Sequence, residues 1–294
     1  MARLVFLGTP EAAVPPLLAL VGAGHDIALV VTRPDKRRGR GSTLVASPVK
    51  AAAAGLGLEV SDSLEDAAGV GAELGVVVAY GRIIPVAVLD VLPMVNLHFS
   101  LLPRWRGAAP VERVILEGDA ETGVCLMAVE AGLDTGGIYA EEGTTVGEEE
   151  TADELRSRLV SIGCRLLVEH LAAGRTSLPP ARDQLGTPSY AEKINAAELH
   201  LQWGQSALQL RRVIRLGRAW TTFRGSRLSI LRATGATGSG GVAGTPGTLD
   251  GTDVVAGDGH RVALLTVQPE GRRRMDAGDW LRGVRPEVGE RLGP

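Results

Sequence analysis

Short apolar runs alternate with longer amphipathic segments through the first half of the chain. The runs at 4–7, 27–31 and 76–79 consist only of Leu, Val, Phe, Ile and Ala, which is typical of strands buried on both faces of a sheet. Between the first two runs, residues 10–21 combine prolines suited to a first helical turn with an apolar stripe. This alternation predicts an α/β domain with a doubly wound, Rossmann-like parallel sheet.

The rest of the chain divides into a helical part and a later β-rich part. The pattern predicts helices over 51–57, 63–68, 111–116, 149–171 and 206–216, and strands over 58–60, 124–130, 228–231, 254–256 and 262–267. A Pro-Pro pair at 179–180 marks a domain edge. We therefore predict an α/β domain over 1–182, a linker over 183–202 and a smaller C-terminal domain over 203–294.

Polar side chains interrupt the apolar pattern at Asn96 and His98. They alternate with Val95 and Leu97, so a strand would place the amide and the imidazole on one face. Ligands of doubly wound sheets bind beyond the carboxyl ends of the strands, where we expect His98 to lie. Asp134 follows in a loop bracketed by glycines and could complete a site.

These three side chains suit acyl transfer. An amide N–H can donate to a developing oxyanion, a histidine can act as donor or base, and a carboxylate can hold a charged histidine. The chain has no Gly-x-Ser-x-Gly motif, so an external nucleophile is favoured over a covalent serine intermediate. The alternative is a structural role, with His98 as a hydrogen-bonded core residue and Asn96 as a turn former. Spacing by itself leaves both interpretations open.

Composition excludes several other classes of protein. Cys125 and Cys164 are the only cysteines, and neither has a Cys or His partner at metal-ligand spacing, so neither a zinc site nor a disulfide framework is predicted. A reducing cytoplasm is the expected location. The apolar N-terminus is broken after residue 7 by a Gly-Thr-Pro-Glu sequence, unlike a signal peptide, and no apolar stretch reaches the length needed to span a bilayer.

Charge is distributed unevenly along the chain. From residue 201 onward there are 14 arginines and 8 acidic residues, a net charge of +6, whereas the whole chain has −3. An acidic body followed by a basic C-terminal domain indicates a polyanionic partner for that domain. The alternative is that these arginines form an ordinary solvated surface.

Two motifs resemble those of the folate-dependent formyltransferases. The first is Asn96-x-His98-x-Ser100-Leu101-Leu102-Pro103, and the second is Gly132-Leu133-Asp134-Thr135-Gly136. The run from 100 to 110 is similar to that of the members that formylate tRNA. The resemblance implies formyl transfer from 10-formyltetrahydrofolate to the α-amino group of initiator methionyl-tRNA. It also implies that Asn96 and protonated His98 stabilise the oxyanion, while Asp134 stabilises the charged imidazole and helps to move the amine proton.

The resemblance also implies binding roles for other residues. Residues similar to the family's folate-binding positions are Ser100, Leu101, Leu102, Pro103, Ile83 and Ile84. A cationic loop over 33–42, containing Arg38 and Arg40, resembles a loop that contacts the acceptor end of tRNA. The C-terminal domain resembles the family's OB-like β-barrel, where Arg272, Arg273 and Arg274 would meet tRNA phosphates. We expect a monomer that uses no metal and no membrane. Arg104 and Arg106 could contact either the glutamate tail of folate or RNA.

Two other functions fit the sequence less well. Another formyltransferase could act on a glycinamide ribonucleotide or a sugar-nucleotide amine, although the Arg-rich loop and the basic C-terminal domain favour tRNA. An RNA-binding protein with an inactive core would bind RNA without moving a formyl group. The chain departs from the family at Gln202, where Asp is usual, and is shortened around Gly217.

Overall fold

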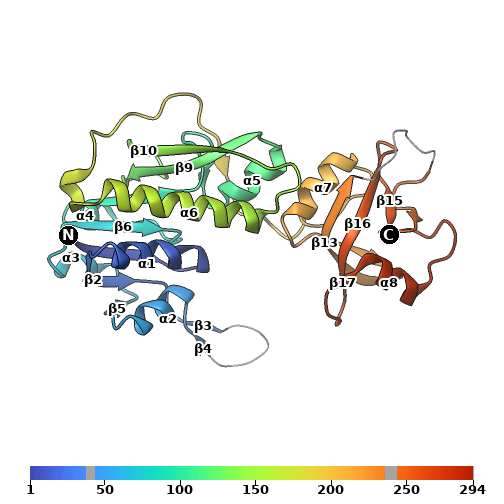
Figure 1. Ribbon diagram of the computed structural model, residues 1–294, viewed down its shortest axis with the longest axis horizontal. Helices are drawn as coiled ribbons and strands as arrows, with labels where there is room; N and C mark the ends of the chain where they lie inside the picture. The colour runs from blue at the N-terminus through green and yellow to red at the C-terminus, as the bar shows by residue number, and fades with distance from the viewer. Residues whose placement is uncertain (38–43, 236–243, 294) are drawn as a thin grey trace. The chain divides into compact units, whose positions relative to one another are not determined.

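The computed structural model describes residues 1–37, 44–235 and 244–293 (Figure 1). It divides into two compact units. The first contains Met1–Val111, Glu121–Thr145 and Arg156–Glu192. The second contains Glu112–Ala120, Val146–Leu155 and Lys193–Pro294. Two short segments that precede residue 156 thus group with the C-terminal residues, so neither unit is one continuous stretch of chain.

A seven-stranded sheet forms the centre of the first unit, in the order β10-β9-β7-β6-β1-β2-β5. The strands are β1 (Arg3–Gly8), β2 (Asp26–Val31), β5 (Val60–Ser61), β6 (Leu74–Val78), β7 (Met94–His98), β9 (Glu121–Ala128) and β10 (Ile138–Thr145). The first five are parallel, and β9 and β10 continue the sheet in antiparallel fashion. The predicted doubly wound sheet is confirmed, with an antiparallel extension at one edge.

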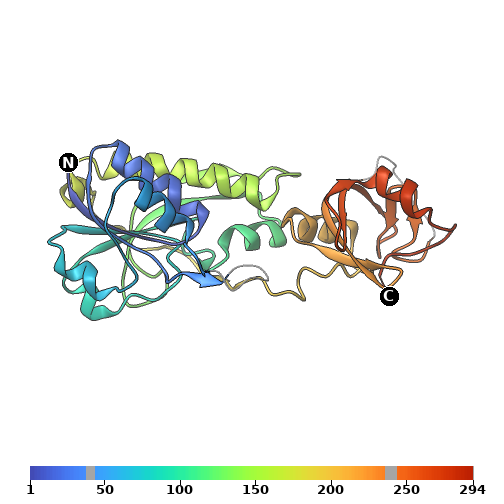
Figure 2. The same cartoon turned by 90° about the horizontal axis from the view of Figure 1, so that it is seen from below.

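Helices cover both faces of this sheet. They are η1 (Glu11–Ala13), α1 (Val14–Gly22), α2 (Pro48–Gly55), α3 (Glu65–Gly69), α4 (Val86–Leu89), α6 (Ala152–His170) and η2 (Gly174–Ser177), and a hairpin of β3 (Lys36–Arg37) and β4 (Leu44–Val45) precedes α2. In Figure 2, α1 and α6 lie on one side of the sheet and α3 and α4 on the other. A Cβ on Gly163 of α6 would come within 2.4 Å of the Leu97 side chain, so this helix packs closely on β7.

The register of β7 gives its polar residues one face. Asn96 pairs with Val77 of β6 and with Met127 of β9, and His98 pairs with Cys125. Met94 lies two residues before Asn96, on the same face of the strand, and packs in a core cluster with residues of α3 and α4. His98 is the last residue of β7, so the expectation that it lies at the carboxyl end of a central strand is confirmed.

An antiparallel sheet forms the centre of the second unit, in the order β12-β13-β16-β15-β14 with β17 beside β16. The elements are α5 (Pro110–Glu117), which begins in the first unit, α7 (Ala207–Arg215), β12 (Trp220–Phe223), β13 (Ser226–Gly235), β14 (Leu249–Asp250), β15 (Asp253–Val255), β16 (Arg261–Pro269), β17 (Met275–Asp276) and α8 (Ala277–Val284). Leu210 of α7 and Trp280 of α8 pack into one core with Ile230 and Val262. The predicted β-rich C-terminal domain is therefore confirmed.

Across the described residues, no helix is both long enough and apolar enough to cross a membrane.

Candidate active site

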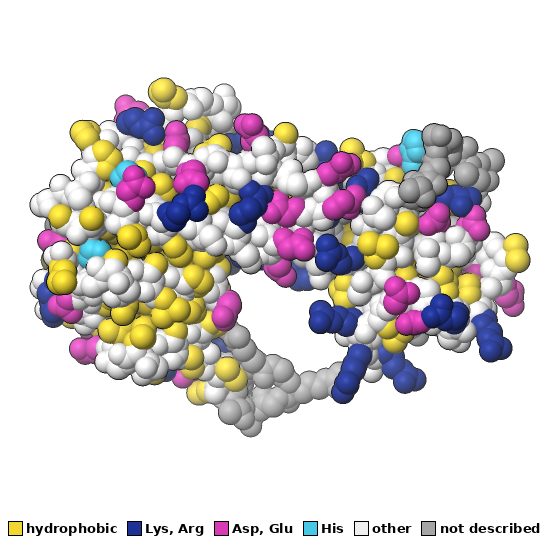
Figure 3. All heavy atoms as spheres, viewed as in Figure 1, with side chains coloured by type: hydrophobic (Ala, Val, Ile, Leu, Met, Phe, Trp, Pro, Cys, Tyr) yellow, Lys and Arg dark blue, Asp and Glu magenta, His cyan; other side chains and the backbone are white. Residues whose placement is uncertain are grey.

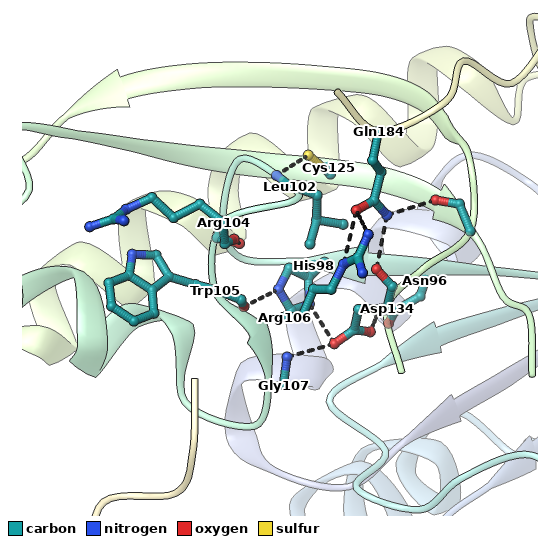
Figure 4. Close-up of polar contacts among 12 residues, drawn as sticks. Asn96, His98, Leu102, Arg104, Trp105, Arg106, Gly107, Cys125, Asp134 and Gln184 are labelled. Carbon is teal, nitrogen blue, oxygen red and sulfur yellow. Dashed lines mark hydrogen bonds and ion pairs between the residues drawn. The ribbon is translucent and has the colours of Figure 1, made fainter. Parts of the chain in front are cut away.

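The structure brings Asn96, His98 and Asp134 together (Figure 4). The first two come from β7, and Asp134 comes from the loop between β9 and β10. One carboxylate oxygen of Asp134, Oδ1, lies 3.4 Å from Asn96 Nδ2, and the other, Oδ2, lies 3.6 Å from His98 Nδ1. The side chains of His98 and Asp134 are only 6% and 14% exposed, and charge interactions are strengthened where water is largely excluded.

A hydrogen bond from its ring fixes the orientation of His98. Its Nε2 lies 2.9 Å from the carbonyl oxygen of Trp105. A carbonyl oxygen only accepts, so the network assigns the proton of the neutral ring to Nε2. Nδ1 then faces the carboxylate of Asp134, and a second proton taken up there would form an ion pair with it. The imidazole is thus oriented by the Trp105 carbonyl and faces the Asp134 carboxylate with its other nitrogen.

Asp134 is held in place by the loop that follows β7. The N–H of Gly107 donates to Asp134 Oδ2 at 2.8 Å. Gly107 has φ +122°, and a Cβ there would come within 2.9 Å of the Ala191 carbonyl oxygen, so this approach requires glycine. Asp134 itself has φ +50°, in the left-handed region that few residues other than Gly, Asn and Asp adopt readily. The carboxylate is therefore fixed by local backbone geometry as well as by hydrogen bonds.

The segment after His98 packs back onto β9. Ser100 Oγ donates to the carbonyl oxygen of Arg104 at 2.6 Å, and the Leu102 N–H donates to Cys125 Sγ at 3.4 Å. Leu102 packs in a small core cluster with Cys125. Burial raises the pKa of the Cys125 thiol to about 12, so Cys125 is an uncharged thiol at neutral pH and acts here as a packing residue.

The residues expected to bind folate differ in exposure. Ser100, Leu102, Pro103 and Ile84 are buried, Leu101 is partly exposed, and Ile83 is 80% exposed. Ile84 packs into the core cluster on the α3 and α4 side of the sheet. Its neighbour Ile83, in the loop between β6 and α4, exposes its apolar side chain to solvent. The buried residues instead anchor the loops in which they lie.

The connector at residues 182–191, most of which lies in the predicted linker, makes contacts with this site that sequence reasoning missed. Residues 190–191 form β11 (Tyr190–Ala191), which pairs in parallel with β8 (Arg106–Gly107). Gln184, in the same connector, donates from Nε2 to the carbonyl oxygens of Asp134 and Gly136, both at 2.8 Å. A glutamine in a linker carries no motif, so nothing in its local sequence marks this contact.

The cationic residues expected to contact RNA lie far in the sequence from Asn96, His98 and Asp134. Arg272, Arg273 and Arg274 are exposed in the turn between β16 and β17. Figure 3 shows Lys and Arg side chains gathered at this end of the second unit. Arg38 and Arg40 lie outside the described residues. Arg106, whose role the sequence left open, donates from Nε and Nη2 to Gln184 Oε1 at 3.1 and 2.7 Å.

No cluster of three or more His, Cys, Asp or Glu side chains that could hold a metal ion occurs within residues 1–37, 44–235 and 244–293.

Comparison with known proteins agrees with this arrangement along the whole chain. The formyl transferase family matches residues 2–171, and the formyl transferase C-terminal domain matches residues 193–285. A methionyl-tRNA formyltransferase of Dinoroseobacter shibae is 44% identical over 96% of this chain and 97% of its own length. One from Streptomyces coelicolor is 41% identical over 99% of both chains.

Solved structures share the fold at lower sequence identity. An N-formyltransferase from Helicobacter canadensis, in complex with folinic acid and dTDP-3-aminofucose, has a TM-score of 0.69 at 19% identity and covers 92% of this chain and 100% of its own. HypX from Aquifex aeolicus, in complex with tetrahydrofolic acid, has a TM-score of 0.66 at 15% identity and covers 98% of this chain and 48% of its own. By its matching domains and its full-length relatives, the chain belongs to the formyl transferase family, among the methionyl-tRNA formyltransferases.

Proposed function

We propose that this enzyme transfers the formyl group of 10-formyltetrahydrofolate to the α-amino group of initiator methionyl-tRNA. The observation that carries the proposal is the convergence of Asn96, His98 and Asp134 at the carboxyl end of β7. The full-length similarity to methionyl-tRNA formyltransferases supports this choice of acceptor. We further propose that it acts as a cytoplasmic monomer.

The geometry supports direct attack of the neutral amine on the formyl carbon. A bond forms between the amine nitrogen and this carbon, and the carbonyl electron pair moves onto oxygen. The Asn96 amide has two N–H groups, of which one faces Asp134, so the second can donate to the oxyanion. His98, protonated at Nδ1 and paired with Asp134, adds positive charge beside the oxyanion.

Collapse of this tetrahedral intermediate completes the transfer. The attacking nitrogen loses a proton, which we assign to Asp134 directly or through a water molecule. The carbonyl re-forms, the bond to N10 of the folate breaks, and the proton taken up by Asp134 passes to N10 to give tetrahydrofolate. The carboxylate is thereby regenerated, and no net proton is consumed.

We propose that the folate lies against the two loops at this edge of the sheet. Ile83, at 80% exposure, is available as an apolar wall for a flat pterin ring. The buried residues Ser100, Leu102, Pro103 and Ile84 fix the backbone whose N–H and C=O groups would contact the ring, and Leu101 borders it. Residues 1–182 would then form the catalytic domain, followed by the linker at 183–202.

We assign tRNA binding to the cationic loop at 33–42 and to residues 203–294, with exposed Arg272, Arg273 and Arg274 meeting phosphates. Arg40→Ala is expected to raise the KM for methionyl-tRNA about 10-fold, because a charge-assisted phosphate contact is lost. Folate affinity should not change. Arg175→Ala removes the same charge from an exposed position in η2 and serves as the control. An unchanged KM in Arg40→Ala would exclude the loop from the tRNA interface.

The acceptor can be identified with a radiolabelled formyl group. Purified enzyme and labelled 10-formyltetrahydrofolate should be offered charged initiator tRNA, charged elongator tRNA, glycinamide ribonucleotide and an amino-sugar nucleotide. We expect label chiefly on methionine of the initiator tRNA. Transfer to either small amine in preference to tRNA would overturn the proposed acceptor, and binding of tRNA without any transfer would show an inactive core.

A further inference from the structure

Gln184 joins two loops that lie far apart in the sequence. Its amide nitrogen donates to the carbonyl oxygens of Asp134 and Gly136. Its amide oxygen accepts both hydrogen bonds from the Arg106 guanidinium. One side chain therefore uses its donors on the loop that carries the candidate catalytic carboxylate and its acceptor on the loop that follows β7 (Figure 4).

These contacts close a ring around the carboxylate. Arg106 is followed by Gly107, whose N–H donates to Asp134 Oδ2, and preceded by Trp105, whose carbonyl accepts from His98. The backbone of Asp134 is thus tied through Gln184 to the same short segment that contacts its side chain. If either loop moved, the Asp134 carboxylate, which accepts from the Gly107 N–H, would shift relative to His98.

The backbone of Asp134 lies in the left-handed region, with φ +50°. In a residue other than glycine, this conformation persists where the surroundings enforce it. Gly136 lies so close to Ala128 that a Cβ on it would come within 2.0 Å of the Ala128 carbonyl oxygen. The two N–H groups of Gln184 hold the carbonyl oxygens of residues 134 and 136.

We propose that Gln184 is a positioning residue that sets the carboxylate of Asp134 against His98. The inference rests on the proposed function, since it assigns Asp134 a part in formyl transfer. Gln184 does not reach the reacting atoms in this scheme. It acts by holding the loop at residues 132–137 where the Asp134 carboxylate meets the Gly107 N–H.

The connector is anchored on both sides of Gln184 without its help. Arg182 and Ile138 exchange backbone hydrogen bonds at 2.8 and 2.9 Å, and the Arg106 N–H donates to the Ser189 carbonyl oxygen at 2.9 Å. Ser189 Oγ also accepts from the Trp105 N–H at 3.0 Å. Loss of the Gln184 amide should therefore release the Asp134 loop locally and leave the connector in place.

Two substitutions separate the donor role of Gln184 from its acceptor role. Gln184→Leu removes both. Gln184→Glu keeps oxygens for Arg106 but offers no N–H to the two carbonyls, and a carboxylate beside them is repelled. Both variants are expected to lower kcat about 10- to 100-fold, because misplacing a catalytic group by about 1 Å has effects of this size. The KM values for folate and tRNA should change less than about 3-fold. Leu185→Gln, the reverse exchange at a neighbouring position that is 84% exposed, is the control.

Hydrogen exchange gives a measurement that does not depend on activity. Peptides that cover residues 130–137 should exchange faster in both Gln184 variants than in the wild type and in Leu185→Gln, while peptides from α6 should not. Restoration of wild-type kcat by Gln184→Glu would show that only the anchor for Arg106 matters, and the proposal would be wrong. A wild-type kcat together with unchanged exchange in Gln184→Leu would also overturn it.

The two levels of inference fail in different ways. If the wild-type enzyme transfers no formyl group to methionyl-tRNA, the proposed function fails, and exchange at 130–137 still tests whether Gln184 positions the loop. If the wild type is active and Gln184→Leu keeps its kcat, only the positioning role fails.

Discussion

Replacement of His98 by alanine is expected to lower kcat for formyl transfer by about 100-fold or more. The imidazole at the end of β7 faces the Asp134 carboxylate through Nδ1, and in the proposed mechanism its charged form stabilises the oxyanion. Removal of one such stabilising group from a preorganised site commonly costs about 10² to 10³ in kcat. Steady-state transfer of labelled formyl to initiator methionyl-tRNA measures this directly.

The His98 substitution needs a control for loss of a buried ring. His98 is 5% exposed, and its removal breaks the hydrogen bond to the Trp105 carbonyl oxygen, at a cost of about 0.5–1.5 kcal/mol in stability. His25 is buried to a similar extent, at 7%, between α1 and β2. His25→Ala should lower the Tm without lowering kcat at a permissive temperature, and binding of 10-formyltetrahydrofolate should survive in both variants. Turnover near the wild-type level in folded His98→Ala would refute the assignment of His98.

Local sequence periodicity predicted the placement of Asn96 and His98 on one strand face, while it left their role open. The alternation of Asn96 and His98 with apolar residues follows from the two-residue repeat of a strand. The structure places both in β7, with His98 at its carboxyl end as expected. The apolar runs at β1, β2 and β6 were equally informative because strands buried on both faces have few alternatives. These features depend on neighbours in the sequence, which a single chain displays.

The rest of the site depends on contacts that a sequence does not display. Asp134 reaches His98 because β9 pairs with β7, and that sheet order has no local signature. The glycines that bracket its loop made Asp134 a candidate, and the resemblance to formyltransferases gave it a role. Strand β10 escaped prediction because its sequence carries two glutamates and a glycine and its side chains are half exposed. Helix α8 was also missed: it has only eight residues, two of them glycines.

Contacts made by backbone atoms were the hardest to foresee. The acceptor for His98 is the carbonyl of Trp105, and the donor to Asp134 is the N–H of Gly107. Every residue except proline carries both groups, so residue type gives no indication of which of them face a site. Gln184 is similar, because the N–H and C=O groups of its carboxamide meet their partners only when the connector is paired with β8.

Asp134→Asn is expected to lower kcat by about 100-fold or more, although it changes the shape of the site very little. Asparagine tolerates the left-handed backbone at this position, and its side-chain oxygen can still accept from the Gly107 N–H. The negative charge that faces His98 and the base that takes the amine proton are both lost. Asp134→Ala should show a similar loss of turnover together with lower stability.

Comparison of Asp134→Asn with Asp134→Ala separates loss of the carboxylate's charge and basicity from loss of stability. If the carboxylate acts by its charge and basicity, Asn and Ala should reduce kcat to a similar extent while only Ala lowers the Tm. Asp183→Asn makes the same exchange at an exposed position of the connector and should leave kcat unchanged. Near wild-type turnover in Asp134→Asn would mean that Asp134 only shapes the loop, and the amine proton would then have to leave through solvent or through another group near His98.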